Sequence, residues 1–248
     1  MKFSIRSQIA LVWWSLGLAI VFGVAFGVFL HMIPPPDASM SSEEVKAWYL
    51  ARDGEIKIGA MISSWTAAFM VPLFVVIGAQ LRRRETGVPV WTMMAAIGGG
   101  LTSVLLVIPP IIFGAAAFHA DRGADATAAI HDLGVLMLVT TDQYFVFCWA
   151  AIIVISLRPG APANWPFPRW YGYLNIWFVG LGEMGAVAYN FDSGLFSWRG
   201  LFPYWSPFGL FGAWVLLTTW LLLRALKGQL AEESAAGTTS DQPVAVAV

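Results

Sequence analysis

Long apolar runs alternate with short polar segments along the chain, and six of these runs are long enough to cross a lipid bilayer. A helix that spans the hydrocarbon core needs about 20 predominantly apolar residues. The pattern therefore predicts an all-α fold, a polytopic membrane bundle of six transmembrane helices within residues 1–227. The predicted spans are Ile9–Leu30, Ile56–Leu81, Val90–Phe118, Asp132–Leu157, Trp170–Tyr189 and Pro207–Leu223.

Two polar segments outside the spans carry further signals. Ser41-Ser42-Glu43-Glu44 has the spacing of a capping box, in which Ser41 and Glu44 bond each other's backbone amides. We expect a short outer interfacial helix over residues 41–53, which either caps the bundle or acts as a mobile gate. Residues 228–248 are rich in Ala, Ser, Thr and Glu, a composition that predicts a disordered cytoplasmic tail.

Composition supports a membrane location, and charge predicts the orientation. Of the 248 residues, 58% are hydrophobic and 12% are charged, whereas soluble domains average about 25% charged residues. Six crossings place nine of the 14 Lys and Arg residues on the side of both termini and five on the other side. The positive-inside rule then predicts cytoplasmic termini. The net charge of −1 argues against a nucleic-acid partner.

Two acids lie deep inside apolar runs: Asp142 in the fourth predicted span and Glu183 in the fifth. An ionised side chain near the bilayer centre costs roughly 2.5–3.5 kcal/mol on insertion scales. Counted from the span ends, the two acids lie about 16 Å and about 20 Å deep, close to the midplane. Consecutive helices are usually neighbours, so we expect both carboxyl groups to face a common interior.

The role of these acids has two interpretations. In the structural one, each carboxyl is protonated and hydrogen-bonds to a facing helix. In the functional one, which we favour, the pair binds a cation, carries protons or anchors a ligand amine or hydroxyl. Further candidate binding residues on the same two spans are Thr141, Gln143, Tyr144, Trp149 and Asn175.

The third predicted span contains Gly98-Gly99-Gly100 and Pro109-Pro110, which thin and kink a helix. Such backbone is tolerated at membrane depth either where helices pack closely or where it lines a cavity. The deep aromatic residues Phe145, Trp149 and Trp177 have a similar pair of interpretations, core packing or an apolar ligand pocket.

All three histidines fall on the predicted outer side. His119 and His131 border one loop, and with Asp132 they form a candidate Zn or Cu site, because imidazole and carboxylate groups bind these metals. The spacing matches no tight metal motif, so ordinary solvated histidines are the alternative. The sequence requires no cofactor, and it contains neither a P-loop nor a dinucleotide fingerprint.

One resemblance adds to this picture. The segments Ile33–Pro36, Phe167–Trp177 and Leu221–Leu226 are similar to parts of a group of bacterial six-helix inner-membrane proteins for which no activity is established. The resemblance implies a bacterial inner (plasma) membrane location. It implies nothing about mechanism.

These features favour an integral membrane protein that binds or translocates a small apolar or weakly basic ligand, with or without proton linkage, through Asp142 and Glu183. One alternative is an accessory membrane subunit of a larger complex. Another is a membrane enzyme with an outer-face His/Asp metal site, although we favour a role without catalysis. The expected partners are the lipid bilayer, a small apolar ligand, and either a second copy of the chain or a partner membrane subunit.

Overall fold

The computed structural model describes residues 4–121, 123–140, 144–182 and 184–240. Within these ranges the chain forms helices and connecting segments and no strand. Five helical segments are long and apolar enough to cross a membrane, which makes the chain a multi-pass membrane protein. They are Ile5–Phe29, Asp53–Arg84, Val90–Phe118, Ala124–Leu157 and Gly194–Ala236.

The elements follow each other closely along the chain. The α-helices are α1 (Ile5–Val24), α2 (Ser42–Leu50), α3 (Asp53–Thr66), α4 (Met70–Leu81), α5 (Val90–Phe118), α6 (Ala124–Thr140), α7 (Phe145–Leu157), α8 (Arg169–Gly182) and α9 (Ser206–Ser240). Short π or 3-10 segments extend or join them at Ala25–Phe29, Ala67–Phe69, Arg82–Arg84, Gly185–Asn190, Gly194–Phe196 and Leu201–Trp205.

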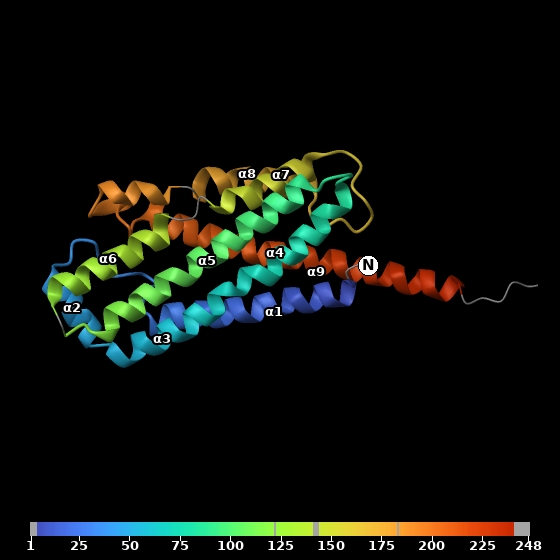
Figure 1. Cartoon of the computed structure of the whole chain (residues 1–248). Coiled ribbons are helices and arrows are strands. Elements are labelled where there is room, and N and C mark those ends of the chain that lie inside the picture. The colour runs from blue at the N-terminus through green and yellow to red at the C-terminus, as the bar shows by residue number, and fades with distance from the viewer. Residues whose placement is uncertain (1–3, 122, 141–143, 183, 241–248) are drawn as a thin grey trace, which may run out of the picture.

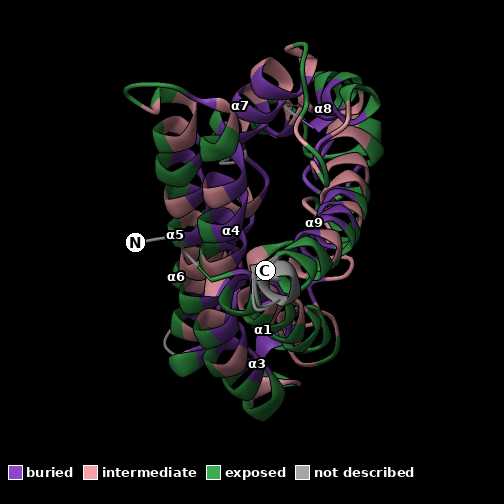
Figure 2. Cartoon of the chain, turned by 90° about the vertical axis from the view of Figure 1, so that its right-hand side faces the viewer, coloured by how far each residue is buried: buried purple, intermediate pink, exposed green. Residues whose placement is uncertain are grey.

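The long helices are arranged in a ring. Around it, α1 packs against α4, α4 against α5, α5 against α7, α7 against α8, α8 against α9, and α9 against α1. Figure 2 views this ring along the bundle. The helices α2, α3 and α6 lie toward one end, whereas the start of α1 and the C-terminal part of α9 lie toward the other (Figure 1).

The sixth predicted span, Trp170–Tyr189, is not confirmed as a long helix. Its counterpart α8 has 14 residues, about 21 Å at 1.5 Å per residue, whereas the hydrocarbon core is about 30 Å thick. A 3-10 segment, Gly185–Asn190, follows it. Glycine lowers helix propensity, and Gly180, Gly182 and Gly185 fall where the α-helix ends.

The predicted capping box is confirmed at the start of α2. Ser41 N donates to Glu44 Oε2 at 2.8 Å, and Glu44 N donates to Ser41 Oγ at 3.4 Å. The helix packs on α6, where the phenol of Tyr49 is fully buried against His131. The short helix therefore covers one end of the bundle.

Three buried glutamines join the ends of α1, α4 and α9. Gln80 Nε2 donates to Gln8 Oε1 at 2.8 Å and to Gln229 Oε1 at 3.3 Å. Gln229 Nε2 donates back to Gln80 Oε1 at 3.0 Å and to the carbonyl of Asn164 at 2.8 Å. These bonds place Gln8 of α1 and Gln229 of α9 at the same position along the long axis of the bundle.

The predicted tail from residue 228 begins differently in the structure, because α9 continues to Ser240. Ala, Leu, Gln and Glu are good helix formers, and a helix already nucleated extends through them at low cost. Contacts on Gln229, and a bond from Asn164 Nδ2 to Glu232 Oε1 at 2.7 Å, support the extension. Residues 241–248 lie outside the described part of the chain.

The glycines of α5 serve close packing. A Cβ on Gly98 would lie 2.7 Å from Cβ of Phe147, and one on Gly99 would lie 2.1 Å from the ring of Phe74. Glycine at these two positions thus lets α5 approach α4 and α7 closely. The helix continues through Pro109 and Pro110 as one element.

Candidate ligand site: an apolar cavity inside the bundle

A cavity of about 340 Å³ lies inside the ring of helices. Residues of α1, α5, α6, α7 and α9 form its walls, together with Gly182 at the end of α8. The lining is almost wholly aliphatic and aromatic. Its volume falls within the range of about 300–1,000 Å³ that is typical of small-molecule sites.

Aromatic side chains form the wall contributed by α7 and α9. The ring of Phe145 lies 4.5 Å from that of Trp149 and 5.6 Å from that of Phe211, centroid to centroid. The prediction for Phe145 and Trp149 offered core packing or an apolar pocket, and in the structure both residues pack in the buried core and border the cavity. Trp177, the third aromatic residue in that prediction, is 66% exposed and lies outside the lining.

The polar groups of the lining differ in how they are bonded. Thr102 Oγ1 donates to the carbonyl of Gly98 at 2.9 Å, and the phenol of Tyr204 donates to the carbonyl of Met32. The indole Nε1 of Trp149 is buried and has no hydrogen-bond partner within the described residues. An unpaired buried N–H costs about 1–3 kcal/mol.

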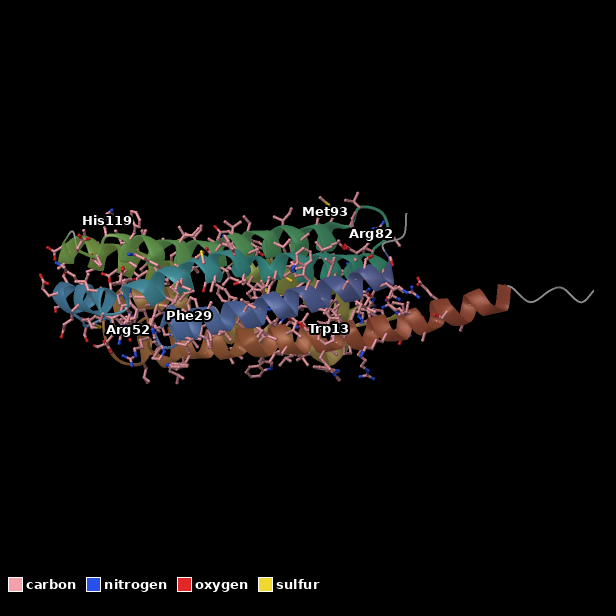
Figure 3. The ribbon with its side chains drawn as sticks, turned by 90° about the horizontal axis from the view of Figure 1, so that it is seen from below. Trp13, Phe29, Arg52, Arg82, Met93 and His119 are labelled. Atoms are coloured by element: carbon pink, nitrogen blue, oxygen red, sulfur yellow. The ribbon has the colours of Figure 1, made fainter. Side chains whose placement is uncertain are left out.

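The cavity opens sideways between α1 and α9. On the far wall, Thr102, Phe145 and Trp149 are buried. The exposed lining residues all belong to α1 and α9, which run side by side along one face of the molecule (Figure 3). These residues are Ile20, Gly23, Phe208, Gly212 and Leu216.

Four of the predicted site residues lie outside the described part of the chain: Thr141, Asp142, Gln143 and Glu183. In the sequence, Glu183 directly follows the lining residue Gly182, and Asp142 precedes the lining residue Phe145 by three positions.

The other predicted binding residues fall in three different settings. Trp149 lines the cavity. Asn175 is buried between α8 and α9, where its Oδ1 accepts from Trp214 Nε1 at 2.9 Å and its Nδ2 donates to the carbonyl of Tyr171 at 2.7 Å. Tyr144, at the start of α7, is 40% exposed and does not line the cavity. Asn175 thus joins helices, and Trp149 is the described candidate that faces the site.

The predicted metal ligands are held by other contacts. His119 Nδ1 lies 3.8 Å from Asp121 Oδ1 near the surface. His131 is buried, and its Nδ1 lies 3.0 Å from the phenol oxygen of Tyr49. No group of three or more His, Cys, Asp or Glu residues that could hold a metal, with Asp132 or any other acid, occurs in the described ranges.

Sequence reasoning missed the residues that close one end of the cavity. Ile33, Pro203 and Tyr204 line that end, and the bond from Tyr204 to Met32 ties the Leu201–Trp205 segment to the loop after α1. The sequence feature that marks this end is the proline-rich Ile33–Pro36 stretch, but a proline run alone does not predict that it borders a cavity.

Comparisons of the chain with models of protein families, with curated proteins and with solved structures found no match.

Proposed function

We propose that this protein is an integral membrane protein that binds a small apolar or weakly basic ligand in the cavity inside the helix ring. The observation that carries the proposal is the cavity itself: an apolar space of ligand size with exposed lining residues on α1 and α9. Apolar lining with few polar groups is the usual make-up of a small-molecule site.

The proposal includes six crossings of a bacterial inner membrane, with both termini in the cytoplasm. The support is that α8 runs from the loop after α7 toward the end where α9 begins (Figure 1), so this short helix and the Gly185–Asn190 segment form the return path. The bonds from Gln80 to Gln8 and Gln229 keep the start of α1 and the C-terminal part of α9 at one end. Arg83 bonds Gln80 and the carbonyl of Asn164 at that end, and Arg82 and Arg84 flank it in the sequence, as the positive-inside rule expects of a cytoplasmic face.

We assign Asp142 and Glu183 the role of polar anchors or proton carriers for this ligand. Their positions in sequence, next to Gly182 and close to Phe145, support the assignment. Acids within membrane spans are costly and usually functional. Translocation would follow if the ligand or a proton moves between the two carboxyl groups during turnover.

The binding test uses N-phenyl-1-naphthylamine, an apolar dye with one N–H group that fluoresces in apolar sites. A phenylalanine at Gly212 would fill the opening without disturbing the fold, because no atom lies within 4 Å of a Cβ added there. Gly209 on the same helix has equal space but does not line the cavity. We expect saturable dye binding, above that of nanodiscs without protein, in the wild type and in Gly209→Phe, and its loss in Gly212→Phe. Equal binding in all three proteins would contradict the proposal.

A second arm tests the acids. If the acids accept a hydrogen bond from the N–H group of the dye, the Asp142→Asn and Glu183→Gln double variant should bind the dye at least tenfold more weakly and lose any pH dependence of binding. Unchanged binding and pH dependence would limit the acids to a structural role.

The accessory-subunit alternative is tested by mild detergent extraction, which would recover a stable complex with another membrane protein.

A further inference from the structure

We propose that the natural ligand is an anionic membrane phospholipid, one acyl chain of which enters the cavity between α1 and α9 while its headgroup lies at Arg224. This inference rests on the cavity of the proposed function and goes beyond it, because the occupant is the acyl chain of an anionic lipid and not a small or weakly basic molecule. Three observations support it: the direction of the cavity opening, the relative position of α1 and α9 along the bundle, and the exposed basic residues on these two helices.

The register follows from the glutamine cluster. Gln8 and Gln229 both bond Gln80, so they lie at one level. Because α1 and α9 run in opposite directions (Figure 1), moving five residues inward along each helix leads to Trp13 on α1 and Arg224 on α9. The two residues therefore share a level about 7.5 Å from the glutamines.

A continuous exposed track connects that level with the cavity. Along α9, Gly212, Leu216, Trp220 and Arg224 are all exposed and follow each other at intervals of four residues. Residues four apart lie next to each other on a helix surface. Gly212 and Leu216 line the cavity, so the track runs from the cavity opening to the guanidinium of Arg224.

The length of the track suits an acyl chain. Eight residues separate Leu216 from Arg224, which corresponds to about 12 Å along the helix. The acyl chains of one leaflet reach about 15 Å, half the thickness of the hydrocarbon core. A chain that starts from a headgroup at Arg224 thus reaches the level of the cavity lining.

The end of the track at Arg224 suits an anionic headgroup. The guanidinium of Arg224 lies 5.7 Å from the ring centroid of Trp220, and within the described residues no salt bridge involves Arg224. Lys227 on α9 and Arg6 on α1 are also exposed, whereas Glu232, further along α9, bonds to Asn164. Arginine binds phosphate through paired hydrogen bonds, and tryptophan is enriched at the headgroup level.

The other end of the track, at the cavity opening, provides space for the acyl chain. No atom lies within 4 Å of a Cβ added at Gly23 on α1 or at Gly212 on α9, and both glycines line the opening. Two glycines facing an opening leave room that larger side chains would fill. Inside the cavity, the acyl chain would exchange its contacts with other lipids for contacts with aromatic and aliphatic side chains.

The experiment counts lipids that remain bound to delipidated protein in a neutral detergent by native mass spectrometry. Dioleoylphosphatidylglycerol and dioleoylphosphatidylcholine are titrated separately, because they share acyl chains and differ in net charge. The proteins are the wild type, Gly212→Phe, Arg224→Gln, and the matched controls Gly209→Phe and Arg169→Gln. Arg169 is an exposed arginine at the start of α8 and belongs to neither α1 nor α9.

We expect one phosphatidylglycerol per wild-type chain, held about tenfold more tightly than phosphatidylcholine, as one charge-assisted contact implies. Gly212→Phe should abolish this site, and Arg224→Gln should remove the preference for phosphatidylglycerol. Both controls should behave as the wild type does. If Arg169→Gln and Arg224→Gln weaken binding equally, the preference is that of any basic surface and the inference is wrong.

The dye experiment separates this inference from the proposed function. If Gly212→Phe blocks the dye but leaves phosphatidylglycerol binding unchanged, the cavity binds small molecules and the lipid inference fails alone. If Gly212→Phe blocks neither, both fail.

Discussion

The phenol oxygen of Tyr49 lies 3.0 Å from Nδ1 of His131, and this contact joins α2 to α6 inside a group of aromatic rings. Burial, with a smaller contribution from Asp132, raises the pKa of Tyr49 above its ordinary value of 10.0. The phenol therefore stays neutral, and the pair is held by a hydrogen bond between buried groups. The other ring nitrogen of His131 has no partner among the described residues.

Replacing Tyr49 by phenylalanine should destabilise the protein by about 1–3 kcal/mol, because both ring nitrogens of His131 would then lack a partner. Thermal unfolding in detergent measures the change. Tyr173→Phe is the control, because Tyr173 is 52% exposed. This variant should unfold at the wild-type temperature. A Tyr49→Phe protein as stable as the control would show that the contact contributes nothing.

Two adjacent glycines of α5 should respond in opposite ways to alanine. At Gly99 the added Cβ meets the Phe74 ring at 2.1 Å, so overpacking should cost about 1–3 kcal/mol. At Gly100 no atom lies within 4 Å, and alanine should stabilise the helix by up to about 1 kcal/mol. Unfolding temperatures of the two variants check the prediction, and similar values would exclude the close contact between α4 and α5.

The C-terminal part of α9 should depend on Gln229. Removing its side chain in Gln229→Ala breaks the bonds to Gln80 and to the carbonyl of Asn164, at a cost of about 1 kcal/mol. Hydrogen exchange of residues 228–236 should then become faster than in the wild type. Glu233→Ala, an exposed substitution on the same helix, is the control, and equal exchange in both variants would contradict the anchoring role.

Glu85 should make stability depend on pH. Its carboxylate accepts from the amides of Trp91 and Thr92 at 2.9 Å each and from Thr92 Oγ1 at 2.6 Å. Burial alone would raise the pKa of Glu85, but these hydrogen bonds outweigh it and lower the pKa from the ordinary value of 4.5. A lowered pKa in the folded state means stabilisation that is present above 4.5 and is lost as pH falls through the folded pKa.

The Glu85→Gln variant should therefore unfold at a lower temperature than the wild type at pH 7, and the difference should shrink on acidification below 4.5. Melting curves of both proteins across this pH range provide the measurement. A difference that stays constant with pH would show that the carboxylate charge is not involved.

Much of the fold follows from apolar run length. The predicted span Val90–Phe118 coincides with α5, and the capping box at Ser41 is present as predicted. The reason is that both signals are local: a run of apolar residues and a pair of side chains three positions apart. The short α8 and the long α9 were harder to predict, because glycine-rich backbone and contacts with distant glutamines decide where those helices end.

The candidate site could be predicted only in part. Depth and aromatic character made Phe145 and Trp149 candidates for either core packing or a pocket, and both residues border the cavity. Asn175 was a plausible site residue by depth, yet its amide is used by Trp214 on α9, a pairing between helices that sequence spacing does not reveal. The same holds for His131, whose partner Tyr49 lies 82 positions away.

The central claim is that the cavity inside the ring is a ligand site, and a density map of the protein in lipid nanodiscs tests it most directly. In protein extracted from native membranes, we predict non-protein density bounded by Phe145, Trp149 and Phe211, in contact with these rings. A map in which α9 packs directly on α5 and α7, with ordered side chains filling that space, would contradict the claim.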